Sequence, residues 1–170
     1  MLRLPVRFAT LATFLLIGLA GCGPSGDPDL HVTSDPQAAV PVSGSSQVVV
    51  TIVNDGDGDD ALVGASTDAA LGVEIHLTEV EDGRATMRQL DTADLPAGER
   101  TRFRPGGLHL MLVVPDETVV EGGTFELTLH FDRSDDLTVP VEVVPLLDLA
   151  DDAFDADLEE PDSDEDVTGD

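Results

Sequence analysis

Apolar and polar residues alternate in short runs along most of the chain, and residues that favour turns follow each run. The clearest run, Gln47–Val53, is rich in β-branched residues and precedes a turn crowded with Asp and Gly. Runs of this kind with such punctuation predict strands. The pattern predicts strands at residues 47–53, 61–65, 72–80, 84–90, 99–104, 108–114, 124–131 and 137–144.

These strands predict an all-β domain. Seven or more short, mainly antiparallel strands separated by turns are typical of a β-sandwich or barrel. No stretch shows a sustained helical period, and nothing resembles an internal repeat. Because the sequence has neither Trp nor Tyr, we predict that Phe103, Phe125 and Phe131 form the aromatic core.

The first residues predict an export signal. Arg3 and Arg7 precede an apolar run that ends at Leu19 and is too short for a membrane span. The following residues complete Leu19-Ala20-Gly21-Cys22, which resembles a bacterial lipobox. We therefore predict a lipoprotein signal peptide at 1–21, lipidation of Cys22, and an extracytoplasmic protein anchored to the bacterial cell membrane. The alternative is an ordinary signal peptide cleaved nearby, which leaves Cys22 as a free thiol.

Charge and composition divide the rest of the chain into three parts. Residues 22–28 are rich in Gly, Pro and Ser and predict a flexible tether. Residues 29–146 are predicted to form one domain. Residues 147–170 are strongly acidic and predict a disordered tail, although Leu146, Leu147, Leu149 and Phe154 would allow its first turn to pack. The net charge of -27 opposes binding to nucleic acid.

Two histidines and two methionines stand out in a sequence poor in both residue types: His76, Met87, His109 and Met111. Thioether sulfur is a soft ligand that favours Cu(I), and imidazole binds several transition metals. His109 and Met111 are two residues apart on one predicted strand, so their side chains share a face. His76 and Met87 flank a turn and are predicted to lie near one another across paired strands. The pattern predicts a four-ligand copper site.

Each of these residues also has a simpler interpretation. A methionine in a small domain most often fills the core. A histidine on a strand is most often satisfied by hydrogen bonds within the protein. Taken singly, each of the four residues favours this simpler interpretation, so the copper prediction rests on the four together.

The spacing His76-x10-Met87-x21-His109-x-Met111 resembles the copper-binding motif of the PCuAC family of periplasmic copper chaperones. Flanking segments are similar too, and the resemblance covers roughly residues 48–144. It implies a cupredoxin-like β-sandwich that binds one Cu(I) and delivers it toward the Cu(A) centre of a haem-copper oxidase. The implied acceptor is cytochrome c oxidase subunit II or a Sco-type protein. Copper sequestration for resistance and a metal-free structural role in the envelope are the alternatives.

The remaining polar groups predict no further chemistry. Asp55, Asp57 and Asp59 imitate the start of a calcium-binding loop, but the required Gly and closing Glu are missing, so we predict a polar turn. His31 and His130 fall outside the motif and are predicted to be surface or strand residues. We find no Ser/His/Asp or Cys/His set for nucleophilic catalysis and expect no enzyme activity.

Overall fold

The computed structural model describes residues 26–33, 35–81 and 83–149. The predicted signal peptide, the lipidation of Cys22, most of the tether and most of the acidic tail lie outside these residues. The described part of the chain forms eleven strands: β1 (Leu30–Val32), β2 (Gln37–Ala39), β3 (Ser45–Asn54), β4 (Asp60–Ser66), β5 (Ala70–Glu81), β6 (Arg84–Leu90), β7 (Ala93–Leu95), β8 (Arg100–Phe103), β9 (Leu108–Pro115), β10 (Thr124–Phe131) and β11 (Leu137–Val144). Within the same residues, no helix has the length and apolar character needed to cross a bilayer.

The predicted all-β class is confirmed, and every strand predicted from the sequence pattern is present. Three strands were not predicted: β1, β2 and β7, each only three residues long. Three residues are too few to display an alternation of apolar and polar positions. These strands exist because longer neighbours offer them backbone partners, since β1 and β2 pair with β3 and β7 pairs with β4.

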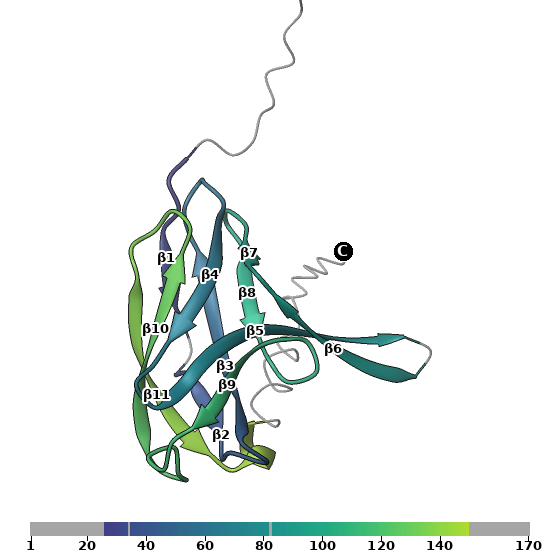
Figure 1. The fold of residues 1–170 in the computed structure, drawn as a ribbon. Helices are drawn as coiled ribbons and strands as arrows, with labels where there is room; N and C mark the ends of the chain where they lie inside the picture. Colours follow the sequence, from purple (N-terminus) through teal and green to yellow (C-terminus); the bar gives the residue numbers. More distant parts are fainter. Residues whose placement is uncertain (1–25, 34, 82, 150–170) are drawn as a thin grey trace, which may run out of the picture.

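The strands form one continuous hydrogen-bonded path that closes on itself (Figure 1). Its order is β6-β5-β9-β3-β2-β11-β10-β4-β7, and a further pairing of β4 with β5 joins the two halves of the sandwich. Strands β1 and β8 both pair with β3 off this path. The pairings are antiparallel except for β2 with β11, so the prediction of a mainly antiparallel sandwich is confirmed.

The core lies between the two halves of the sandwich and follows the alternation seen in the sequence. Along β3, Val48, Val50 and Ile52 point inward and are buried, while the residues between them are partly exposed. Phe103, Phe125 and Phe131 are all buried in this cluster, as predicted. Apolar burial of this kind is the main force that stabilises a domain without an internal disulfide.

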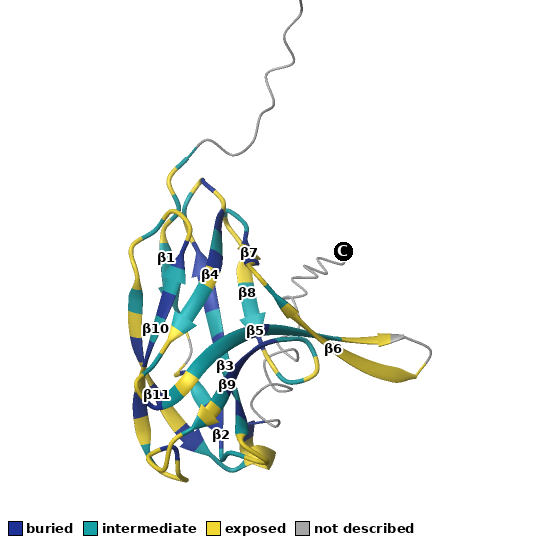
Figure 2. Ribbon diagram, in the orientation of Figure 1, coloured by how far each residue is buried: buried dark blue, intermediate teal, exposed yellow. Residues whose placement is uncertain are grey.

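The hairpin of β5 and β6 projects away from the body of the sandwich (Figure 1). Strand β6 lies at one end of the path and is exposed along all but its last residue, as the yellow ribbon in Figure 2 shows. Strand β9 is different, because it lies between β5 and β3 and is buried on both faces from His109 to Leu112. The fold therefore places an exposed strand on one side of β5 and a strand with a buried central segment on the other.

Candidate metal centre

The strand registers place His76, Met87, His109 and Met111 on one face of the sheet. His76 pairs directly with His109, and Met111 pairs with Glu74, which is two residues before His76 on β5. Met87 pairs with Thr78, two residues after His76. Residues paired across strands and residues two apart along a strand share a face. We call this surface of β5, β6 and β9 the His/Met face.

The His/Met face is opposite to the face of the same strands that packs in the core. Ile75 pairs with Leu110 on the core side, and both are buried there. Met111 is 9% exposed and Met87 is 50% exposed, and among the described residues neither belongs to the hydrophobic core cluster. Met87 is therefore not core filler, whereas Met111 is buried outside the main core cluster.

Accessibility rises across the His/Met face from β9 to β6. His109 is fully buried and Met111 nearly so. The side chain of His76 is 13% exposed, and Met87 on the edge strand is half exposed. The His/Met face is thus buried on the β9 side and open to solvent on the β6 side.

The ring of His109 is held by one backbone carbonyl. Its Nδ1 lies 2.9 Å from the carbonyl oxygen of Gly107, which also accepts a hydrogen bond from the backbone N–H of Thr78. Gly106, at φ 77°, makes the turn that presents this carbonyl, and this backbone conformation favours glycine. Since a carbonyl oxygen only accepts, Nδ1 carries the proton and Nε2 of the neutral ring has a free lone pair.

Burial also favours the neutral form of His109. Desolvation lowers the pKa of the ring, the hydrogen bond to Gly107 raises it, and the neighbouring imidazole of His76 lowers it; the net pKa is below the ordinary value for histidine. A neutral imidazole is the form that binds metals. His109 is therefore held in the protonation state that a ligand requires.

His76 is held by a side chain instead of a backbone group. Its Nε2 lies 2.9 Å from a carboxylate oxygen of Glu74, two residues earlier on β5. The rings of His76 and His109 meet edge to face, with centroids 5.8 Å apart. The two rings are thus in contact, and each is oriented by a hydrogen bond through one of its nitrogens.

The second nitrogen of each ring is buried without a hydrogen-bond partner. These atoms are Nδ1 of His76 and Nε2 of His109. A buried polar atom left unpaired costs about 1–3 kcal/mol, so native proteins retain few of them without a reason. Two imidazole nitrogens and two thioethers on one face form a neutral set of soft and borderline ligands, which fits Cu(I). The described residues contain no group of three or more His, Cys, Asp or Glu side chains placed to hold a metal ion, so the candidate site depends on the methionines.

Sequence reasoning singled out the four candidate ligands but missed the groups that orient them. Glu74 and the carbonyl of Gly107 gave no signal, because an acidic residue on a strand and a glycine in a turn are common. One clue was present, since Glu74 is two residues from His76 and a strand puts such residues on the same face.

The acidic turn after β3 is a polar turn, as predicted. Asn54 and Asp60, at its two ends, are buried. The Asn54 amide donates to the carbonyls of Gly58 and Leu95, and Asp59 accepts a hydrogen bond from the backbone N–H of Ala97. The side chains of Asn54 and Asp59 are therefore engaged by groups of the protein itself.

One sequence-based expectation is wrong in geometric terms, because the structure does bring a Ser, a His and an Asp together. Ser66 Oγ lies 2.8 Å from Nε2 of His130, and Nδ1 of His130 lies 2.9 Å from Asp136. Ser66 and His130 are 64 positions apart in the sequence, and Asp136 follows His130 by six, so no local spacing could reveal the group. His130 is on strand β10, as its interpretation as a strand residue expected.

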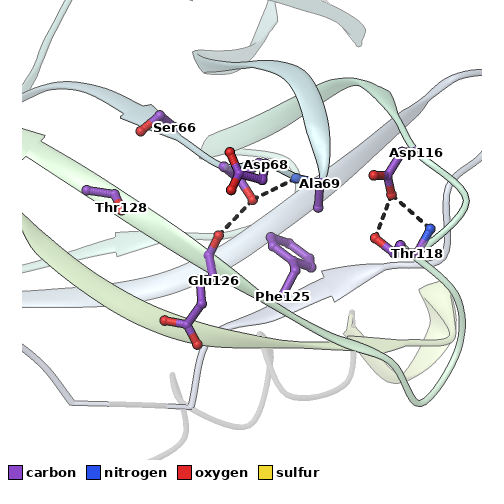
Figure 3. A pocket seen from close by; sticks show the side chains of 9 residues that line it. Ser66, Asp68, Ala69, Asp116, Thr118, Phe125, Glu126 and Thr128 are labelled. Atoms are coloured by element: carbon purple, nitrogen blue, oxygen red, sulfur yellow. Dashed lines mark hydrogen bonds between the residues drawn. The ribbon is translucent and has the colours of Figure 1, made fainter.

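The surroundings of this Ser66–His130–Asp136 group do not suit acyl transfer. Ser66 borders an open pocket of about 460 Å³ (Figure 3). The acidic residues Asp68, Asp116 and Glu126 line the same pocket. Negative charge opposes the oxyanion that a serine hydrolase must stabilise. We therefore interpret the group as a surface hydrogen-bond network that ties β4 to β10 and the turn that follows it.

Solved structures of PCuAC domains share the β-sandwich architecture of this chain. A copper-bound PCuAC domain from PmoF2 has a TM-score of 0.55 and 24% identity, covering 68% of this chain and 98% of that domain. The Cu(I)-bound DR1885 of Deinococcus radiodurans has a TM-score of 0.56 and 24% identity, covering 66% of this chain and 77% of that protein. At this level of identity the likeness establishes the fold, and the predicted cupredoxin-like sandwich is confirmed.

Sequence comparison then places the chain in a family. Residues 29–143 match the LpqE-like family model, described as "Putative lipoprotein LpqE-like". A relative from Leifsonia xyli subsp. xyli, "Putative lipoprotein Lxx21020", is 30% identical over 152 residues, which cover 84% of this chain and 90% of the relative. The chain belongs to the LpqE-like family.

Proposed function

We propose that this chain is an extracytoplasmic copper carrier that binds one Cu(I) through His76, Met87, His109 and Met111. The observation that carries the proposal is the pair of buried imidazole nitrogens without partners, one from each of two histidines that face each other across β5 and β9. The registers add a methionine on each side of this pair. The copper-bound state of two structural neighbours, the PmoF2 domain and DR1885, supports the choice of metal.

The ligand set suits an oxidising compartment. Imidazole and thioether are neutral ligands and hold Cu(I) without a thiolate, which is open to oxidation outside the cytoplasm. The family and the Leifsonia relative are both described as lipoproteins, which supports an anchor at Cys22. A tether of a few residues would then hold the copper site close to the membrane surface.

The gradient of exposure favours delivery over storage. Met87 is on an exposed edge strand, whereas His109 and Met111 are buried. An incoming ligand from an acceptor can therefore replace the Met87 thioether first, while the buried ligands still hold the ion. We propose transfer by this ligand exchange, toward an oxidase Cu(A) domain or a Sco-type protein as acceptor.

A Cu(I) competition titration tests the binding step. The protein is the chain from residue 22 onward carrying Cys22→Ser, which removes its one thiol and so excludes binding there. We expect one Cu(I) per chain, and Met87→Leu, Met111→Leu, His76→Ala and His109→Ala should each weaken binding. His31→Ala and His130→Ala are matched controls, because these histidines are on β1 and β10. Absence of Cu(I) binding, or equal loss in the controls, contradicts the proposal.

A transfer assay separates delivery from the alternatives. The Cu(I)-loaded protein is mixed with a soluble Cu(A) domain or a Sco-type protein, and copper is followed on the acceptor. Transfer supports delivery. Tight binding without transfer to either acceptor, together with copper sensitivity of cells that lack the gene, would support sequestration instead.

A further inference from the structure

We propose that Glu74 is the positioning residue of the copper site: it holds the proton of His76 on Nε2 and thereby keeps Nδ1 free to bind the metal. This inference rests on the proposed function. It adds a residue that the His/Met spacing does not include. It also assigns a different metal-binding nitrogen to each of the two histidines.

The assignment follows from what each hydrogen-bond partner can do. A carboxylate oxygen only accepts, so the contact of 2.9 Å between Glu74 and Nε2 of His76 requires the proton on Nε2. The carbonyl of Gly107 imposes the opposite arrangement on His109, with the proton on Nδ1. In the neutral rings, the two buried nitrogens without partners are then the two that carry lone pairs: Nδ1 of His76 and Nε2 of His109.

Glu74 is built into the His/Met face. It pairs with Met111 across β5 and β9, and it precedes His76 by two residues on the same side of the strand. Its side chain is 37% exposed and reaches the inner His76, whose side chain is only 13% exposed. A partner of this kind fixes ring orientation and makes the imidazole a better donor, and its loss costs roughly 10–100-fold in metal affinity at known sites.

Glu74 also brings the only negative charge that contacts a candidate ligand among the described hydrogen bonds and ion pairs of these four residues. The four ligands are neutral, so a bound Cu(I) leaves the site with one positive charge. The carboxylate compensates this charge without binding the ion. The two histidines are therefore not equivalent, since a charged side chain supports His76 and a neutral backbone carbonyl supports His109.

Nuclear magnetic resonance of the metal-free protein tests the assignment directly. At about pH 8, where unperturbed imidazole is neutral, we expect two ring N–H signals protected from exchange with water: one on Nε2 of His76 and one on Nδ1 of His109. Glu74→Ala should abolish the His76 signal and keep the His109 signal, which serves as an internal reference. Glu74→Gln should keep the His76 signal, because the amide oxygen also accepts.

Glu79→Ala is the matched control. Glu79 is on the same strand but on the opposite face, where it pairs with Arg88 at 3.0 Å. We expect Glu74→Ala to lower Cu(I) affinity by roughly 10–100-fold, Glu74→Gln to lower it less, and Glu79→Ala to leave it unchanged.

A proton on Nδ1 of His76 in the unsubstituted protein, or a His76 signal that persists in Glu74→Ala, would overturn the inference. Unchanged Cu(I) affinity in Glu74→Ala would overturn it as well. If the unsubstituted protein binds no Cu(I), the proposed function fails, while the ring N–H signals still decide whether Glu74 positions His76.

Discussion

Two groups of polar side chains in the described part of the domain have opposite hydrogen-bonding states. The first is the loop cluster around Asn54 and Asp60. Each nitrogen and oxygen atom of the Asn54 amide and of the Asp60 carboxylate makes two hydrogen bonds there. The second is the pair His76 and His109, where each ring keeps one buried nitrogen without a partner.

This difference distinguishes polar groups that stabilise the fold from polar groups that are available to bind a ligand. A buried polar group with all its partners rigidifies a fold and specifies one loop arrangement. A buried polar atom without a partner is a cost that the fold alone does not explain. We therefore expect substitutions in the loop cluster to reduce stability and leave copper binding intact. Substitutions on the His/Met face should weaken copper binding and leave stability nearly unchanged.

The largest effect on stability is expected for Asn54→Ala. This side chain accepts hydrogen bonds from the backbone N–H groups of Asp29 and Gly56 and donates to two carbonyls. Its removal leaves buried backbone groups unpaired and should cost about 3 kcal/mol in the free energy of unfolding. Urea denaturation measures the loss. Asn54→Asp should not restore the stability, because a buried carboxylate oxygen would face the carbonyls of Gly58 and Leu95. A stable Asn54→Ala variant would show that the cluster is not structural.

Asp60→Asn should cost about 2 kcal/mol at neutral pH, because an amide nitrogen would face groups that now donate to a carboxylate. Burial raises the pKa of Asp60, but hydrogen bonds from Ser134, Ala61 and Arg133 outweigh burial and bring the pKa below its ordinary value. A carboxyl whose pKa is lower in the folded protein stabilises the fold above its unfolded pKa, and this contribution is lost as the pH falls through the folded pKa.

The pH dependence gives a second measurement of the same residue. Stability of the unsubstituted protein should fall as the pH is lowered from about 5 toward 2. The Asp60→Asn variant should fall less steeply over that interval, because it lacks this carboxyl. Equal slopes would mean that Asp60 does not titrate differently in the folded and unfolded chains.

His109→Leu tests the other side of the comparison. It removes one unpaired buried nitrogen and one hydrogen bond to Gly107, whose carbonyl keeps the N–H of Thr78. We expect the stability of the metal-free protein to change by less than about 1 kcal/mol, while Cu(I) binding is severely weakened. His130→Leu should retain Cu(I) binding. A collapse of the fold in His109→Leu would instead assign this histidine a structural role.

The smallest effect concerns strain on the strand that carries His109 and Met111. Val114 on β9 has φ 50°, a left-handed conformation that is costly for a β-branched residue. Val114→Gly should therefore raise the free energy of unfolding by up to about 1 kcal/mol, as measured by thermal melting. Val113→Gly is the control and should lower stability, because no strain is relieved there. A lower melting temperature for Val114→Gly would contradict the argument.

The parts of the fold that follow from the alternation of apolar and polar residues could be predicted from the sequence. The parts that depend on pairing with distant strands could not. The longer strands and the core residues Phe103, Phe125 and Phe131 followed from a period of two. The three-residue strands did not, since pairing alone holds them. A turn placed His76 near Met87, and a spacing of two placed His109 beside Met111, but the pairing of β5 with β9 that brings the two histidines together was not predicted. The Ser66 network requires the register of the sheet, which no local pattern contains, whereas the spacing of Glu74 and His76 was a local clue to their contact.

X-ray absorption at the copper edge of the Cu(I)-loaded protein tests the central claim most directly. The sample is again the chain from residue 22 with Cys22→Ser, so sulfur near copper can come only from methionine. We predict both sulfur and nitrogen in the first shell, with sulfur lost when Met87 and Met111 are both replaced by Leu. A first shell of nitrogen and oxygen alone in the unsubstituted protein would contradict the copper site proposed on the His/Met face.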